Sequence, residues 1–202
     1  DKKRIFFTGA PQLDDIHYND KITKSDYYVV IFHPVLNEQK KIDQQLKNLL
    51  QAINETGIKV VWIYPNNDVG YTKILKKIKK FKNKNIKIAA NFERSEFIKL
   101  LKKSKGMIGN SSAGIIEASS LKLPVVNIGS RQNGRPQSIN ITNCNYDLVN
   151  IKKKINYISK NIKFKKSLKK AKNPYFLKNS STLITKILTN LKLNDNLLKK
   201  YW

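Results

Sequence analysis

Cysteine is almost absent from the sequence, which has one, Cys144, in 202 residues. A single cysteine cannot form an intrachain disulfide and cannot build a thiolate metal cluster, so a cytoplasmic setting fits best. The two histidines, His17 and His33, stand apart and offer no clustered ligand set, so we expect neither a metal nor another cofactor. Runs of about 18 apolar residues and a signal-peptide pattern are also missing, so no membrane partner is expected.

Arginine is also rare in the sequence. The chain has 40 basic residues against 14 acidic ones, a net charge of +26, but only four of the basic residues are arginines: Arg4, Arg94, Arg131 and Arg135. A strong positive charge suggests a nucleic-acid-binding protein. However, arginine is the residue that reads base edges and stacks on bases, and the lysines are spread over nearly every predicted helix. We therefore interpret most lysines as solvated surface residues and expect no nucleic-acid partner.

The length of the chain limits the number of domains it can form. With 202 residues, 40% of them hydrophobic, it can bury the core of one domain with an appendage. The sequence opens on Asp1 rather than Met, and an apolar segment follows almost at once. We therefore expect a piece of a longer protein.

Short apolar runs alternate with helical patterns along the first 130 residues. The runs are rich in β-branched and aromatic residues and lie at 27–33, 58–64, 85–90, 106–109 and 123–129. The helical patterns lie at about 38–55, 71–82, 94–104 and 113–121. Nearly continuous apolar strands alternating with helices predict an α/β fold, a Rossmann-like doubly wound parallel sheet.

Polar and small residues follow each predicted strand. They are His33-Pro34, Asn66 and Asp68, Asn91-Phe92, Gly109-Asn110-Ser111-Ser112 and Gly129-Ser130-Arg131-Gln132. Ligands of such sheets bind at the carboxyl ends of the strands. The sequence therefore predicts that these loops converge on one binding crevice.

The segment GNSSAGIIEASS at 109–120 suggests the ligand of that crevice. A strand that runs through a glycine and serines into a helix presents first-turn amides, which favour a diphosphate. Ser111 and Ser112 could add hydroxyl donors, and Glu117, one turn into the helix, could accept hydrogen bonds from ribose. Arg131 could reach the diphosphate from the next strand end.

Two other interpretations of this segment stay open. In the first, Ser111 is only an N-cap, Glu117 is a solvated helix residue and the segment 131–135 is a surface turn. In the second, Ser111 is a catalytic nucleophile. The second is disfavoured because alanine stands where a nucleophile elbow needs its last glycine, and because both histidines precede the serine.

Four segments resemble the carboxyl-terminal half of the hydrolysing UDP-N-acetylglucosamine 2-epimerases. They are TGAPQLD at 8–14, HPV at 33–35, YPNNDVG at 64–70 and GNSSAGIIEASSLKLPVVNIGSRQNGR at 109–135. The resemblance covers about residues 5–140. It implies the second domain of a glycosyltransferase-B-type enzyme that has two Rossmann-like domains.

The resemblance also implies roles for individual residues. Ser111, Ser112 and Arg131 match residues that hold the diphosphate of UDP, and Glu117 matches the carboxylate that binds its ribose. Phe92 stands where the main chain of the family grips the uracil.

Two further positions match residues that face the cleft between the domains. Asn66 falls in a Pro-Asn-x-Asp loop, and His33 matches a histidine implicated in catalysis, where it would stabilise or protonate the departing diphosphate. From the sequence alone, His33 before Pro34 would equally suit a packed residue at a strand end.

The family reaction sets the expected function. It eliminates UDP across C1 and C2 of the sugar, giving a glycal, and then adds water to release N-acetylmannosamine for sialic or related nonulosonic acid synthesis. The acid and base carboxylates belong to the first domain, so we expect this chain by itself to bind UDP without turnover. The implied layout is a linker at 1–25, a UDP-binding domain at 26–172 and a helical segment at 173–202 that packs toward the first domain.

One departure and several alternatives accompany the resemblance. Where relatives tend to have a glycine-rich segment, this chain has Asn173 to Lys178, which leaves open how its last helix, at about 180–192, docks. A stand-alone or degenerate UDP-binding module would share the same pocket, and a basic nucleic-acid-binding protein is the second alternative. A homo-oligomer is possible.

Overall fold

The structure is a computed structural model that describes residues 5–17 and 23–191. It contains two compact units. One is Ile16–Pro174, and the other consists of the described residues of Asp1–Asp15 and Tyr175–Trp202. The tail beyond residue 191 and the start of the chain before residue 5 lie outside the described residues.

The larger unit is built on six parallel strands. They are β1 (Tyr28–Ile31), β2 (Val60–Ile63), β3 (Ile86–Ala89), β4 (Met107–Gly109), β5 (Val125–Ile128) and β6 (Ile141–Cys144), in the spatial order β3-β2-β1-β4-β5-β6. The order reverses between β1 and β4, and the chain crosses from one half of the sheet to the other at that point. In open α/β sheets this is where a ligand crevice forms.

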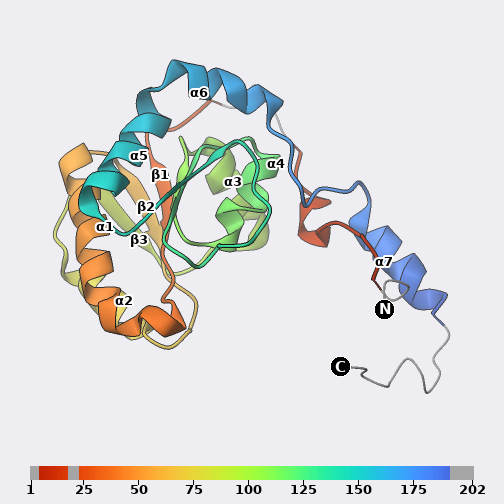
Figure 1. Cartoon of the computed structure of the whole chain (residues 1–202), viewed down its shortest axis with the longest axis horizontal. Helices are drawn as coiled ribbons and strands as arrows, with labels where there is room; N and C mark the ends of the chain where they lie inside the picture. The colour runs from red at the N-terminus through yellow and green to blue at the C-terminus, as the bar shows by residue number, and fades with distance from the viewer. Residues whose placement is uncertain (1–4, 18–22, 192–202) are drawn as a thin grey trace. The chain divides into compact units, whose positions relative to one another are not determined.

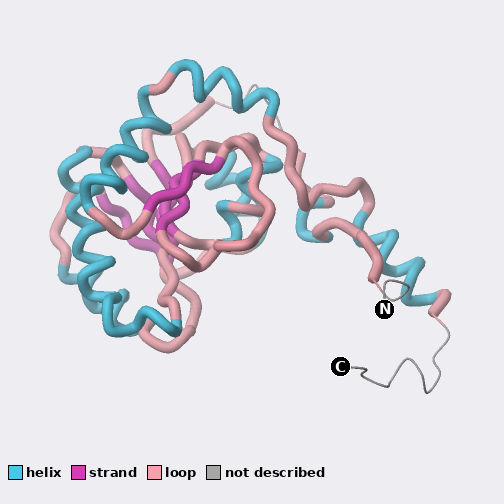
Figure 2. The backbone as a smooth tube through the Cα atoms, in the orientation of Figure 1, coloured by secondary structure: helices cyan, strands magenta, loops and turns pink. Residues whose placement is uncertain are grey.

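Helices cover both faces of this sheet (Figures 1 and 2). On one face lie α1 (Ile42–Thr56), α2 (Tyr71–Lys80) and α5 (Leu148–Lys160), and on the other lie α3 (Arg94–Lys103) and α4 (Glu117–Ser120). The helix α6 (Ile162–Ser167) follows α5, and short 3-10 turns occur at Leu36–Lys41, Ser112–Gly114 and Leu168–Lys170. Helix α1 ends at Gly57, whose φ of 65° gives the left-handed cap that glycine favours.

The main core lies between the sheet and the face that carries α1, α2 and α5. Alternate residues of β1 and β2, including Val30 and Trp62, point into it and are fully buried. Leu49 and Ile53 of α1 and Ile155 of α5 cover them from the helix side. The strands are short and apolar because both faces of the sheet are covered.

The predicted α/β fold is confirmed, with three local corrections. All five predicted strands form, but the sequence analysis missed β6, an edge strand whose residues Ile141–Cys144 are half polar. It also missed α5 and α6. The helix expected at 113–121 is wrong as a single element, because a 3-10 turn at Ser112–Gly114 is followed by α4, only four residues long.

The smaller unit joins the two ends of the described chain. Its helix α7 (Ser180–Thr189) falls within the expected helix at about 180–192. The carboxylate of Asp14 accepts hydrogen bonds from the amides of Ser180 at 3.0 Å and Ser181 at 2.8 Å, and these bonds lower the pKa of Asp14. A residue far away in sequence therefore caps the first turn of α7.

Gly109 is required by the close approach of β4 to β1. Its φ is +133°, and a Cβ atom at this position would lie 1.9 Å from the carbonyl oxygen of Ile31. Gly134 also has a positive φ, of +77°, but nothing lies within 4 Å of the corresponding Cβ position.

These two glycines make a matched pair of variants. We expect Gly109→Ala to lower the free energy of unfolding by roughly 3 kcal/mol or more, because backbone strain adds to a clash with a strand carbonyl. Gly134→Ala should cost only about 1 kcal/mol, the conformational term by itself. Urea unfolding of both variants measures the difference, and equal losses would contradict the close approach.

Candidate functional site

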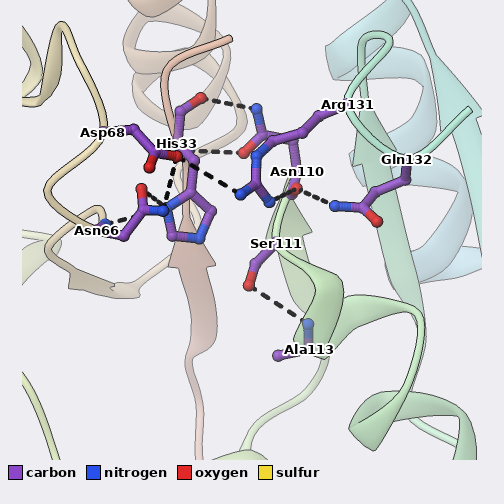
Figure 3. A network of polar contacts seen from close by, with 8 residues as sticks. All are labelled: His33, Asn66, Asp68, Asn110, Ser111, Ala113, Arg131 and Gln132. Carbon is purple, nitrogen blue, oxygen red and sulfur yellow. Dashed lines mark hydrogen bonds and ion pairs between the residues drawn. The ribbon is translucent and has the colours of Figure 1, made fainter. Parts of the chain in front are cut away.

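The carboxyl ends of β1, β2, β4 and β5 bring polar side chains into one network (Figure 3). His33 follows β1, Asn66 and Asp68 follow β2, Asn110 and Ser111 follow β4, and Arg131 and Gln132 follow β5. His33, Asn66, Asp68, Asn110, Arg131 and Gln132 are linked by hydrogen bonds or an ion pair. The predicted convergence of these loops is therefore confirmed for the ends of four strands.

Asn110 connects the two central strands. It is fully buried, its Oδ1 accepts a hydrogen bond from the His33 amide at 2.7 Å, and its Nδ2 donates to the His33 carbonyl at 2.8 Å. The Asn110 amide donates to the Ile31 carbonyl at 3.1 Å. One side chain thus continues the pairing of β1 with β4 beyond their last residues and fixes the backbone of His33. Sequence analysis placed Asn110 at the crevice but gave it no role.

The His33 ring contacts a single neighbour through Nδ1. This nitrogen lies 2.8 Å from Oδ1 of Asn66 and 3.1 Å from the Asn66 amide nitrogen, which can donate to it. The side-chain amide of Asn66 is held in turn, because its Nδ2 donates to Asp68 at 2.7 Å. Burial, aided by the nearby charge of Arg131, lowers the pKa of His33 to about 4. The imidazole is therefore neutral at pH 7.

Arg131 lies between an acid and a backbone carbonyl. Its Nη2 is 3.7 Å from a carboxylate oxygen of Asp68, and its Nη1 donates to the Asn110 carbonyl at 3.3 Å. Burial lowers the pKa of Arg131 somewhat, but a guanidinium remains charged at all ordinary pH values. Both contacts are longer than ideal charged hydrogen bonds, so an incoming anion can compete for the guanidinium.

Hydrogen bonds from neighbouring segments hold the loop that carries Arg131. Glu38 accepts hydrogen bonds from the Ser130 hydroxyl and, at 2.7 Å, from Gln45 Nε2. Burial opposes ionisation of Glu38, but these hydrogen bonds outweigh it and keep its pKa below the usual value. Gln132 is 1% exposed and donates to the Asn110 carbonyl at 2.7 Å. Sequence analysis missed Glu38, whose position in a 3-10 turn after β1 carries no motif.

The serine pair begins a turn rather than a long helix. The Ser111 hydroxyl accepts a hydrogen bond from the Ala113 amide at 3.3 Å, so Ser111 is the N-cap of this turn, and its role toward a ligand stays a prediction. The Gly114 amide donates to the Ser111 carbonyl at 3.1 Å. Because these amides have partners and α4 is short, a helix dipole contributes little here. Ser111 and Ser112 are both half-buried, and each carries a hydroxyl that can donate to an anion.

Glu117 is not a solvated helix residue, and that alternative is wrong. It is 8% exposed, and its carboxylate lies 3.0 Å from Nη1 of Arg94, the first residue of α3. Phe92 is half-buried in the loop just before α3, so the ion pair connects the segment after Phe92 to α4. Sequence analysis did not predict a role for Arg94, because ion-pair partners distant in sequence leave no local pattern.

The arrangement is suited to binding an anion. It combines a partly buried guanidinium, a neutral imidazole and two serine hydroxyls at the point where the strand order reverses. The Asp68 carboxylate is engaged with Asn66 and Arg131, and Glu117 is engaged with Arg94. In the described part of the chain, no group of three or more histidine, cysteine, aspartate or glutamate residues could hold a metal ion. None of the described helices is long and apolar enough to cross a membrane.

The chain is similar to known proteins in both sequence and structure. The profile of the family described as UDP-N-acetylglucosamine 2-epimerase matches residues 1–189. The chain is 36% identical over 153 residues to a UDP-N,N'-diacetylbacillosamine 2-epimerase (hydrolyzing) of Legionella pneumophila, covering 69% of this chain and 41% of that protein. It is 32% identical over 173 residues to the polysialic acid biosynthesis protein P7 of Escherichia coli, covering 84% and 44%.

Among solved structures, the UDP-GlcNAc 2-epimerase of Methanocaldococcus jannaschii in complex with UDP-GlcNAc and UDP has a TM-score of 0.71 at 20% identity. The match covers 94% of this chain and 56% of that one. This likeness confirms the predicted α/β fold class. The chain spans about two fifths of the length of the curated relatives it matches.

The neutral state of His33 leads to a prediction about pH. Because the folded pKa of about 4 lies below the ordinary 6.5, the unfolded chain takes up this proton first. We expect the contribution of His33 to stability to be present above pH 6.5 and to be lost as the pH falls toward 4. A His33→Gln variant should lose less stability over that range than the parent chain.

An NMR titration of the His33 ring, assigned with the same variant, measures the pKa directly. Saturating pyrophosphate should raise it, since an adjacent anion favours the imidazolium. A midpoint that pyrophosphate leaves in place would show that the anion binds elsewhere.

Proposed function

Because this chain belongs to the UDP-N-acetylglucosamine 2-epimerase family, we propose that it is the UDP-binding half of a hydrolysing UDP-sugar 2-epimerase. The observation that carries the proposal is the convergence of His33, Arg131 and Ser111 on the strand ends where the sheet order reverses. Hydrolysing members at 29–36% identity among the relatives support this type of reaction.

The proposed nucleotide contacts use residues that differ in chemistry. Ser111, Ser112 and Arg131 hold the diphosphate, because hydroxyl donors and a forked cation match its oxygens. Glu117 accepts hydrogen bonds from the ribose hydroxyls, and its ion pair with Arg94 fixes the orientation of the carboxylate. The main chain at Phe92 binds the uracil. Because the contact is made by the backbone, it does not depend on which side chain stands at this position.

His33 is the proposed catalytic residue, with Asn66 as the residue that orients its ring. Removal of the sugar C2 proton and cleavage of the C1–oxygen bond place a new negative charge on the departing diphosphate. A histidine and an arginine at the leaving group stabilise that charge, and a diphosphate beside His33 raises its affinity for a proton. Nδ1 is occupied by Asn66, which leaves Nε2 to face the ligand.

The base that takes the C2 proton is proposed to lie in the first domain. Asp68 and Glu117 are each paired with an arginine within this unit, so both carboxylates are already engaged. The whole enzyme, in this proposal, joins a first domain to the described unit, and the unit that contains α7 packs toward that domain. This chain by itself then binds UDP without turnover, and a homo-oligomer is compatible with the site.

The proposed substrate is UDP-N-acetylglucosamine or a related UDP-2-acetamido sugar. Water addition to the glycal then yields N-acetylmannosamine or its counterpart, for sialic or nonulosonic acid synthesis. The names of the relatives, a diacetylbacillosamine epimerase and a polysialic acid biosynthesis protein, support this pathway. The single cysteine supports a cytoplasmic location.

The experiment measures turnover by the full-length protein. We expect it to release UDP and N-acetylmannosamine from UDP-N-acetylglucosamine, or to act on a related UDP-2-acetamido sugar, whereas the 202-residue chain does not. His33→Ala should lower kcat by roughly 100-fold or more, with a much smaller change in UDP affinity.

The control is His17→Ala, which removes the exposed second histidine and should leave kcat unchanged. Full kcat in a folded His33→Ala enzyme would remove the catalytic role of His33. Turnover by the 202-residue chain at the rate of the whole enzyme would overturn the assignment of the base to another domain.

A further inference from the structure

A cavity lies at the opposite end of the sheet from the proposed UDP site. It has a volume of about 730 Å³, and its walls come from the amino ends of β1, β2, β4 and β5 and from the ends of α3 and α5. All of its lining residues fall within the larger compact unit. The size is in the range of small-molecule sites, roughly 300–1,000 Å³.

Lysine is concentrated around this cavity far beyond its share of the chain. Eight of the sixteen lining residues are lysines: Lys24, Lys59, Lys102, Lys105, Lys122, Lys160, Lys165 and Lys169. In the whole chain lysine accounts for 36 of 202 residues, the 40 basic residues less four arginines. The abundance of lysine in the composition therefore does not explain the cluster.

Five of the eight lysine ammonium groups have partners within the chain. Lys24 donates to the Lys102 carbonyl at 2.7 Å and Lys122 to the Lys169 carbonyl at 2.9 Å, and Lys165 donates to the Ser159 carbonyl. Such lysines complement the negative ends of helices. Lys59 and Lys105 share the carboxylate of Asp26.

Asp26 is the one acid among the lining residues, so the cavity holds a large excess of positive charge. In particular, the charges of Lys102, Lys160 and Lys169 are balanced by no acid of the lining. Like charges that surround one cavity repel each other, and a multiply charged anion relieves the repulsion.

Part of the cavity lining is apolar, and we call this part the apolar floor. It consists of Tyr28, Ile58, Leu121, Pro124 and Leu168, and the Tyr28 hydroxyl donates to Ser159 at 2.9 Å. An inorganic anion would leave this surface without a partner, whereas a ligand with a ring or a carbon skeleton would cover it. The flexible, point-charged lysines suit several phosphate oxygens better than a planar carboxylate.

We propose that this cavity binds a small organic polyphosphate, with the organic part on the apolar floor and the phosphates among the lysines. The inference does not rest on the proposed function, because the cavity and the UDP site share no residue. Calorimetry with ATP as the probe tests it, on the 202-residue chain and on its Arg131→Ala variant. Both should bind one ATP at this cavity with the same affinity.

Two triple variants with the same loss of charge distinguish ATP binding in this cavity from general attraction of ATP to a positively charged protein. Lys102→Gln/Lys160→Gln/Lys169→Gln should weaken ATP binding by roughly 10-fold or more. Lys73→Gln/Lys76→Gln/Lys80→Gln removes the same charge from the exposed face of α2 and should change the affinity by less than about 2-fold.

The other outcomes are decisive as well. Equal losses in the two triple variants, or no ATP binding at all, would overturn the proposal. Tripolyphosphate, which lacks the organic part, should bind roughly 10-fold more weakly than ATP, since it gains nothing from the apolar floor. Tripolyphosphate binding as tight as ATP would show that the floor takes no part.

Discussion

The candidate site depends on one contact, between the segment Gly109-Asn110 and the end of β1. The backbone of both residues and the side chain of Asn110 take part in it. Gly109 allows the Ile31 carbonyl to approach where any Cβ atom would clash. Asn110 then binds both the amide and the carbonyl of His33. Its own carbonyl accepts from Arg131 and Gln132, so the loops after β1, β4 and β5 are positioned through one buried residue. Without this contact, His33 and Arg131 would lie on independent loops.

The fold could be predicted from the sequence because the central strands are short, apolar and buried on both faces. The edge strand β6 could not, since polar Thr142 and Asn143 interrupt its apolar residues and it has a neighbour on one side only. The length of the helix expected at 113–121 was overestimated. The chain at Ser112–Gly114 forms a tighter 3-10 turn, which a helical hydrophobic pattern does not reveal.

The candidate site could be predicted in part, since strand ends in such a sheet converge wherever their residues lie in the chain. The supporting contacts could not. Arg94 with Glu117, Glu38 with Ser130, and Asn110 with His33 each join segments that are distant in sequence, and they became visible only in the folded chain. The roles toward a nucleotide sugar stay predictions for every site residue: His33, Asn66, Phe92, Ser111, Ser112, Glu117 and Arg131.

Isothermal titration calorimetry with UDP and with pyrophosphate tests the account most directly, because it separates the ribose from the diphosphate. Glu117→Gln keeps an acceptor for Arg94 but loses the charged acceptor for ribose. It should weaken UDP by roughly 10-fold, the equivalent of about 1.5 kcal/mol, and leave pyrophosphate nearly unchanged. Arg131→Ala should weaken both ligands. Losses in the same ratio for both ligands in both variants would contradict the placement of UDP on these strand ends.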